Sequence, residues 1–123
     1  MLRLIIADDH PAVLQAIRQL LQEEFPSAYI GEATDTKTLL DKALNQSWDL
    51  VSSDLVMHGE SGFEVLRKIK QAKKTLPVII VSSYPAEQYL VRSLQAGASD
   101  FVAKDSLPGG LIEAIQKILN LKK

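Results

Sequence analysis

The chain carries five charged or hydroxyl side chains that directly follow or end short apolar runs, and their types suit chemistry on a phosphoryl group. Asp8 and Asp9 follow residues 2–7, Asp54 follows residues 49–53, Ser82 ends residues 78–82, and Lys104 follows residues 100–103. Three carboxylates gathered in one place repel one another, at about 4 kcal/mol per contact for ~4 Å and an effective dielectric constant of ~20. A divalent cation that prefers oxygen ligands, such as Mg²⁺, relieves that repulsion.

The formal charges of this cluster balance once a divalent cation is included. Three aspartates contribute −3, Lys104 contributes +1 and Mg²⁺ contributes +2, which sum to zero. Phosphoryl transfer depends mainly on positioning and on neutralising charge, so such a site suits a phosphoryl group in transit. Asp54 could then act as a nucleophile that forms an acyl phosphate.

The elements that must position these residues alternate along the chain. Apolar runs typical of short strands occupy residues 2–7, 29–33, 49–53, 78–82 and 100–103. Between and after them, apolar residues recur with the 3.6-residue period of amphipathic helices. Helix signals accompany these stretches, including Pro11 at a first turn, Asp35 as a cap and Gly97 after a last turn.

Five strands that alternate with five helices predict an α/β domain with right-handed crossovers, a parallel sheet and helices on both faces. Functional groups of such sheets gather at the carboxyl ends of the strands. The five candidate residues all stand at strand ends of that kind, whereas Ala33 and Thr34, which end the second strand, offer nothing comparable.

Composition limits the class of protein. The 123 residues include 14 basic and 15 acidic side chains and 46% hydrophobic residues, as expected of one globular domain. The near-neutral charge argues against nucleic-acid binding by the domain as a whole. The chain has no cysteine, which excludes thiolate catalysis and fits a reducing cytoplasm, and no apolar run long enough to cross a bilayer.

The pattern resembles the receiver domain of two-component response regulators, over residues 1–123. The resemblance is carried by the five strand-end residues and by the stretches 54–62 and 96–104. Lys104-Asp105 is most similar to the NarL/FixJ branch. The family implies a single (βα)5 CheY-like, flavodoxin-like domain with strand order 2-1-3-4-5. It also implies a helix-turn-helix domain beyond this chain, which would bind DNA and regulate transcription.

The resemblance further implies a role for each site residue. Asp54 would accept a phosphoryl group from a sensor histidine kinase or a phosphotransfer protein. Asp9, Asp54 and the backbone carbonyl of Val56 would ligate Mg²⁺ directly, and Asp8 would hold it through water. Lys104 would pair with the phosphoryl oxygens. The protein would then be no enzyme in the ordinary sense, but a phosphoacceptor that assists its own phosphorylation and dephosphorylation.

The same resemblance implies a two-state switch. The Ser82 hydroxyl would move to the phosphoryl group, and Phe101 would swing inward. The output face would comprise the fourth helix, the fifth strand and the fifth helix.

Two features of this particular sequence bear on the site and on the output face. Val56 and Tyr84 flank the site with bulky side chains that have little ability to orient water, which predicts a long-lived acyl phosphate. Tyr89, Leu90 and Val91 are consecutive on a predicted helix and span about 200° of its circumference, so at least one must lie at the surface. This surface makes a homodimer that forms on phosphorylation a reasonable hypothesis.

Other interpretations compete. A degenerate receiver would act as a protein-interaction module without phosphotransfer. A haloacid-dehalogenase-like phosphatase usually has Asp-x-Asp where this chain has Asp8-Asp9-His10. A nucleotide binder is a poor fit, because residues 7–12 contain no glycine and carry two anions where a phosphate would bind. Taken one at a time, these residues also have purely structural interpretations. Asp8 and Asp9 could cap a helix, Asp54 could form an Asx-turn, and Lys104 could be a solvated loop lysine. His10 and His58 lack metal-ligand spacing and are assigned no role, and Trp48 is assigned to packing.

Overall fold

The computed structural model describes residues 1–57, 59, 61–84, 86–107 and 109–121. Its sheet contains five parallel strands in the order β2-β1-β3-β4-β5, which confirms the predicted order. The strands are β1 (Arg3–Ala7), β2 (Tyr29–Ala33), β3 (Leu50–Asp54), β4 (Val78–Ser82) and β5 (Asp100–Ala103). The order reverses between β1 and β3, so this pair forms the switch point at which ligands of such sheets bind.

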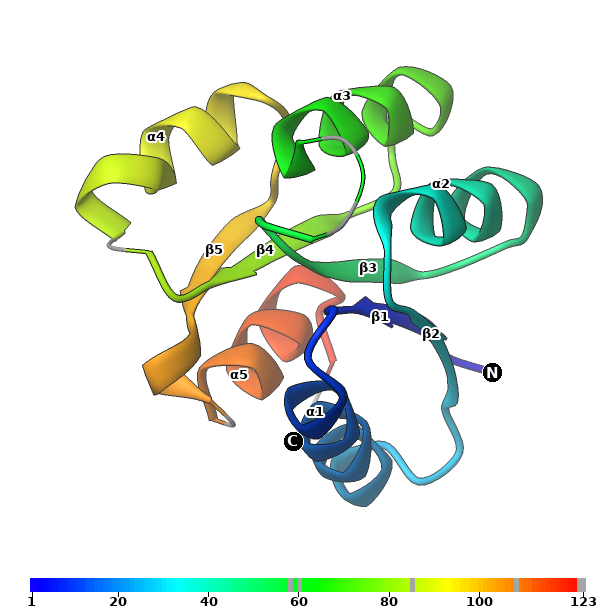
Figure 1. Ribbon diagram of the computed structural model, residues 1–123. Coiled ribbons are helices and arrows are strands. Elements are labelled where there is room, and N and C mark those ends of the chain that lie inside the picture. The colour runs from blue at the N-terminus through cyan, green and yellow to red at the C-terminus, as the bar shows by residue number, and fades with distance from the viewer. Residues whose placement is uncertain (58, 60, 85, 108, 122–123) are drawn as a thin grey trace.

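Five helices cover the two faces of the sheet. They are α1 (Pro11–Glu24), α2 (Thr36–Asn45), α3 (Gly62–Ala72), α4 (Ala86–Gln95) and α5 (Gly109–Ile118). In Figure 1, α1 and α5 lie on one face, and α2, α3 and α4 lie on the other. A short 3₁₀ helix, η1 (Lys104–Ser106), follows β5 and was not predicted from the sequence.

Local signals in the sequence explain where several helices begin and end. Pro11 occupies the first turn of α1, and the helix ends at Phe25, directly before Pro26. The Asp35 carboxylate caps α2 by accepting a hydrogen bond from the Thr38 backbone N–H at 2.7 Å. Gly97 follows α4 with φ of 110°, the left-handed conformation in which glycine is favoured.

Two apolar cores lie on opposite faces of the sheet. The three inner strands, β1, β3 and β4, are buried along their whole length apart from the first residue of β1. The core beneath α1 and α5 includes Leu14, Ile17, Leu111 and Ile115. The core beneath α2, α3 and α4 includes Leu39, Ala43, Phe63, Leu66 and Ile69. Leu44, near the carboxyl end of α2, is exposed.

Trp48 packs at the amino-terminal edge of the sheet, as predicted. Its ring stacks on Tyr29 with centroids 5.9 Å apart, and its Nε1 donates to the Lys42 carbonyl at 2.9 Å. A Cβ atom at Gly31 would lie 2.4 Å from this ring, so the strand needs glycine there. Among the described residues, no helix is long and apolar enough to cross a membrane.

Candidate phosphoacceptor and metal site

Strand register brings the predicted site residues to one edge of the sheet. Ala7 is in register with Ser53, so Asp8 and Asp54 follow these two residues side by side. Asp54 is in register with Val81, and Ser82 is in register with Ala103. Because all strands are parallel, Asp54, Ser82 and Lys104 therefore meet at the carboxyl ends of three neighbouring strands.

Lys104 bridges two buried carboxylates. Its Nζ lies 3.0 Å from Oδ2 of Asp8 and 3.0 Å from Oδ2 of Asp54. The Asp8 and Asp54 side chains are 2% and 6% exposed, and the Lys104 side chain is 16% exposed. Buried charges persist only where they are paired, so one ammonium serves both carboxylates.

The environment raises the pKa of both Asp54 and Lys104. Burial is the main cause that raises the pKa of Asp54, and the Asp8 charge adds to it, against the hydrogen bond from Lys104. Burial alone would lower the pKa of Lys104, but its hydrogen bonds and charge interactions with Asp54 and Asp8 outweigh it and raise the pKa. The Lys104 ammonium therefore stays charged at neutral pH. It faces two carboxylates, so a further cation would stabilise the charged form of Asp54, which burial and the Asp8 charge disfavour.

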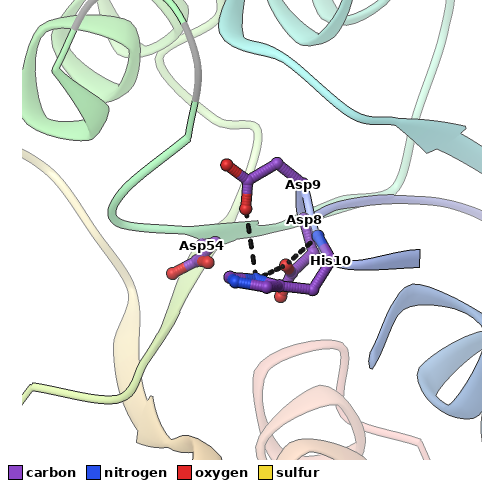
Figure 2. A group of neighbouring side chains, drawn as sticks. All are labelled: Asp8, Asp9, His10 and Asp54. Carbon is purple, nitrogen blue, oxygen red and sulfur yellow. Dashed lines mark hydrogen bonds and ion pairs between the residues drawn. The ribbon is translucent and has the colours of Figure 1, made fainter. Parts of the chain in front are cut away.

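Asp9 extends the cluster toward a cation site. Its Oδ1 is buried and has no hydrogen-bond partner among the described residues. Asp8, Asp9, His10 and Asp54 each offer one ligand atom, and these atoms lie within 4.8 Å of one another. Figure 2 shows the four side chains converging from the ends of β1 and β3. A buried carboxylate oxygen that accepts no hydrogen bond and lies beside two other carboxylates suits Mg²⁺, which prefers oxygen ligands.

The sequence did not identify His10 as part of this cluster. Its Nδ1 lies 2.8 Å from Oδ1 of Asp8 and 3.1 Å from Oδ1 of Asp9, and its backbone N–H donates to Asp8 at 2.9 Å. The only signal was its position between Asp9 and Pro11, at the start of α1. His58, the other histidine, lies outside the described residues.

Ser82 and Phe101, the predicted switch residues, are both buried. The Ser82 Oγ accepts a hydrogen bond from the Tyr84 backbone N–H at 3.0 Å. Phe101 lies in the core beneath α2, α3 and α4, and Tyr89 packs against the same core.

An aromatic row begins next to the site. The Tyr84 and Tyr89 rings have centroids 5.2 Å apart, and the Tyr89 and Phe63 rings have centroids 6.4 Å apart. These rings and exposed Val56 line an open cavity of about 260 Å³.

The predicted exposed apolar residue of α4 is Val91. It is 61% exposed, whereas Tyr89 and Leu90 are half-buried against the core. Leu94, one turn further along the helix, is also exposed. The outer side of α4 therefore presents two large aliphatic side chains.

Comparisons with known proteins identify the family. Residues 4–116 match the model of the response regulator receiver domain. The glycerol metabolism activator of Pseudomonas putida is 34% identical over 98% of this chain and 55% of its own length. The nitrate/nitrite response regulator protein NarP of Escherichia coli, of NarL/FixJ type, is 33% identical over 93% of this chain and 53% of its own length. The chain thus spans about half the length of these curated relatives.

Solved structures of receiver domains have the same fold as this chain. A CheY-like receiver domain protein from Methanospirillum hungatei superposes with a TM-score of 0.88 and 29% identity, covering 98% of this chain and 94% of that one. The response regulator TrrA of Thermotoga maritima, solved in complex with Mg²⁺-BeF, superposes with a TM-score of 0.86 and 30% identity, covering 96% and 99%. The chain belongs to the response regulator receiver domain family, with relatives of the NarL/FixJ type.

Proposed function

We propose that this chain is a phosphorylation-activated switch in which Asp54 accepts a phosphoryl group from a sensor histidine kinase or a phosphotransfer protein. The observation that carries the proposal is the Asp54 carboxylate, buried at the end of β3 and bridged through Lys104 to Asp8. In the transfer, an Asp54 oxygen forms a bond to phosphorus while the bond from phosphorus to the donor atom breaks.

The chain's own residues prepare this step. Lys104 contacts Oδ2 of Asp54 and leaves Oδ1, for which the described residues show one distant hydrogen bond, from the Val56 backbone N–H at 3.5 Å. Asp9, Asp54 and the Val56 carbonyl would hold Mg²⁺ directly and Asp8 would hold it through water. The bound ion would neutralise charge on the phosphoryl oxygens. After transfer, the Lys104 ammonium is already within reach of the new phosphoryl group and would pair with it.

Ser82 would convert phosphorylation into a conformational change. Its Oγ holds the Tyr84 backbone N–H, and a hydroxyl that turns to the phosphoryl group would loosen that contact. The Tyr84 ring contacts the tilted ring of Tyr89 on α4, so a shift of the loop that carries Tyr84 would displace α4. Phe101 would move inward in the same core, which couples β5 to the change.

Val56 and Tyr84 are proposed to prolong the life of the acyl phosphate. Both are exposed and line the cavity beside the site, and neither side chain carries an amide or a carboxylate that would hold a water molecule next to Asp54. Replacing Val56 by asparagine supplies an amide that can position water, so we expect hydrolysis of the acyl phosphate to speed up several-fold. The rate is measured by loss of phosphoprotein after removal of the donor. An unchanged or slower rate in Val56→Asn would contradict this role.

The output would be a change of assembly and, through a further domain, of transcription. Val91 and Leu94 give α4 an apolar surface beside β5, suited to a homodimer that forms on phosphorylation. RcsB of Salmonella enterica, 28% identical to this chain, was solved bound to a promoter in the presence of BeF₃⁻. By analogy, DNA binding would belong to an effector domain and not to these residues. Sedimentation velocity should show dimers only with a phosphodonor; monomers under both conditions would contradict the dimer.

Intact mass after incubation with Mg²⁺ and acetyl phosphate tests phosphorylation directly. The chain should gain about 80 Da, one HPO₃ group, and the gain should require Mg²⁺ and vanish in Asp54→Ala. The variant should bind no phosphoryl group while keeping the fold, which circular dichroism checks. No mass gain in the folded wild-type chain would contradict the proposal and favour a degenerate receiver that acts only through its surface.

A further inference from the structure

We infer that Arg18 and Lys42 close the outer edge of β2 to a second strand, and that without them this edge would pair with β2 of another copy of the chain. β2 is the first strand in the order of the sheet and pairs with β1 on one side. A strand at the end of a sheet presents backbone N–H and C=O groups on its other side, where a strand of another molecule can pair with them.

The hydrogen bonds of β2 show which of its backbone groups face outward. The Tyr29 N–H donates to the Leu2 carbonyl at 2.8 Å, so Tyr29 faces β1. Successive residues of a strand direct their backbone groups to opposite sides, so every second residue from Tyr29 on also faces β1. Ile30 and Glu32 therefore direct their N–H and C=O groups away from the sheet and form its outer edge.

Two cationic side chains occupy the carbonyl groups of this edge. Nη1 of Arg18, on α1, donates to the Ile30 carbonyl at 3.3 Å and also to the Glu32 carboxylate. Nζ of Lys42, on α2, donates to the Glu32 carbonyl at 2.7 Å. In Figure 1, α1 and α2 lie on opposite sides of β2, so one cation reaches the edge from each face of the sheet. An incoming strand would have to displace both side chains.

The edge itself fits a second copy of β2. Two identical edges that pair antiparallel about a two-fold axis form a closed dimer. With Gly31 opposite Gly31 of the second copy, Ile30 lies opposite Glu32 of that copy, and the outward backbone groups of each such pair exchange two hydrogen bonds. The two Glu32 side chains are then not directly opposite each other, so their like charges oppose this register little.

Replacing both cations by methionine opens the edge. Arg18→Met/Lys42→Met removes the two donors and keeps long side chains in their place. Sedimentation velocity without a phosphodonor should show self-association tighter than that of wild type by on the order of tenfold or more. Lys37→Met, which removes an exposed lysine from the same helix as Lys42, should leave self-association unchanged. Unchanged self-association of the double variant, with its fold verified by circular dichroism, would overturn the inference.

A third substitution distinguishes strand pairing from adhesion of the new methionines. Proline at position 32 lacks the N–H that a second strand needs, and because Glu32 faces away from β1, it removes no hydrogen bond from the sheet. Glu32→Pro in the double variant should abolish self-association, whereas Glu32→Thr in the same background keeps the N–H and should retain it. Self-association that survives Glu32→Pro would overturn the inference.

Hydrogen exchange of individual amides tests the edge in the wild-type chain as well. In wild type, the Ile30 and Glu32 amides should exchange at rates that do not depend on protein concentration. In Arg18→Met/Lys42→Met, their exchange should slow by on the order of tenfold as the concentration rises, because the second strand protects them. Concentration-dependent protection of these amides in wild type would show that the edge already pairs, and would overturn the inference.

Discussion

Replacing Lys104 by methionine is expected to lower the free energy of unfolding by about 3–5 kcal/mol at pH 7, because it leaves buried carboxylates without their cation. Methionine keeps the length and apolar character of the lysine stem, so the packing change is small. Asp8 and Asp54 are almost fully buried, and Lys104 Nζ lies 3.0 Å from an oxygen of each. Urea unfolding followed by circular dichroism measures the difference.

The loss of stability in Lys104→Met should depend on pH. Burial already raises the pKa of Asp54 in the folded chain, and removing the ammonium removes the interactions that oppose this rise. The folded state then binds more protons than the unfolded state above the ordinary pKa of an aspartate, so stability falls as pH rises through that range. The deficit should therefore be largest at neutral pH and shrink in acid, where the carboxylates are protonated in both states.

Mg²⁺ and a matched lysine make this test specific. A cation that binds only the folded state stabilises it by mass action, so millimolar Mg²⁺ should restore part of the loss in Lys104→Met. Lys117→Met removes an exposed lysine on α5 and should change the unfolding free energy by less than about 0.5 kcal/mol. A loss in Lys104→Met that is the same at pH 4 and pH 7, or the same size as in Lys117→Met, would contradict the account.

The sequence predicted which side chains lie together at this edge of the sheet, because one rule of parallel sheets sufficed. Each of β1, β3, β4 and β5 was recognisable from its apolar run, and its carboxyl end carries one of the residues Asp8, Asp54, Ser82 and Lys104. The register of the strands brings Asp8 and Asp54 side by side, and Lys104 contacts both. The bounds of β2, β4 and β5 were also predicted correctly, since turn residues and charged residues interrupt the apolar runs there.

Features that depend on side-chain placement could not be predicted in this way. The contact of His10 with Asp8 and Asp9 depends on how the backbone turns between β1 and α1, for which the sequence has no periodic signal. The ring contact between Tyr84 and Tyr89 joins a loop to a helix, so only tertiary packing determines it. Leu44 is exposed although it continues an apolar stripe, because α2 ends one residue later.

Replacing Gly62 by alanine is expected to destabilise the chain by about 1–3 kcal/mol and to slow phosphorylation of Asp54. A Cβ atom at Gly62, the first residue of α3, would lie 2.3 Å from the Leu55 carbonyl oxygen and 2.9 Å from its carbonyl carbon. Both are backbone atoms, which cannot rotate aside as a flexible side chain could. Leu55 directly follows Asp54, so relief of the clash would shift the peptide between Leu55 and Val56, next to the phosphoacceptor.

Gly109→Ala provides the matched control for this prediction. Gly109 is the first residue of α5, as Gly62 is of α3, and a Cβ atom there meets nothing within 4 Å. Alanine should stabilise the chain there by about 0.4–1 kcal/mol, because it restricts the unfolded chain and favours the helix. Thermal unfolding and the rate of mass gain with acetyl phosphate are measured for both variants. Gly62→Ala could prove as stable as Gly109→Ala and become phosphorylated at the wild-type rate. In that case, close backbone packing next to Asp54 does not position the phosphoacceptor. A slower rate with lowered stability only in Gly62→Ala would show that it does.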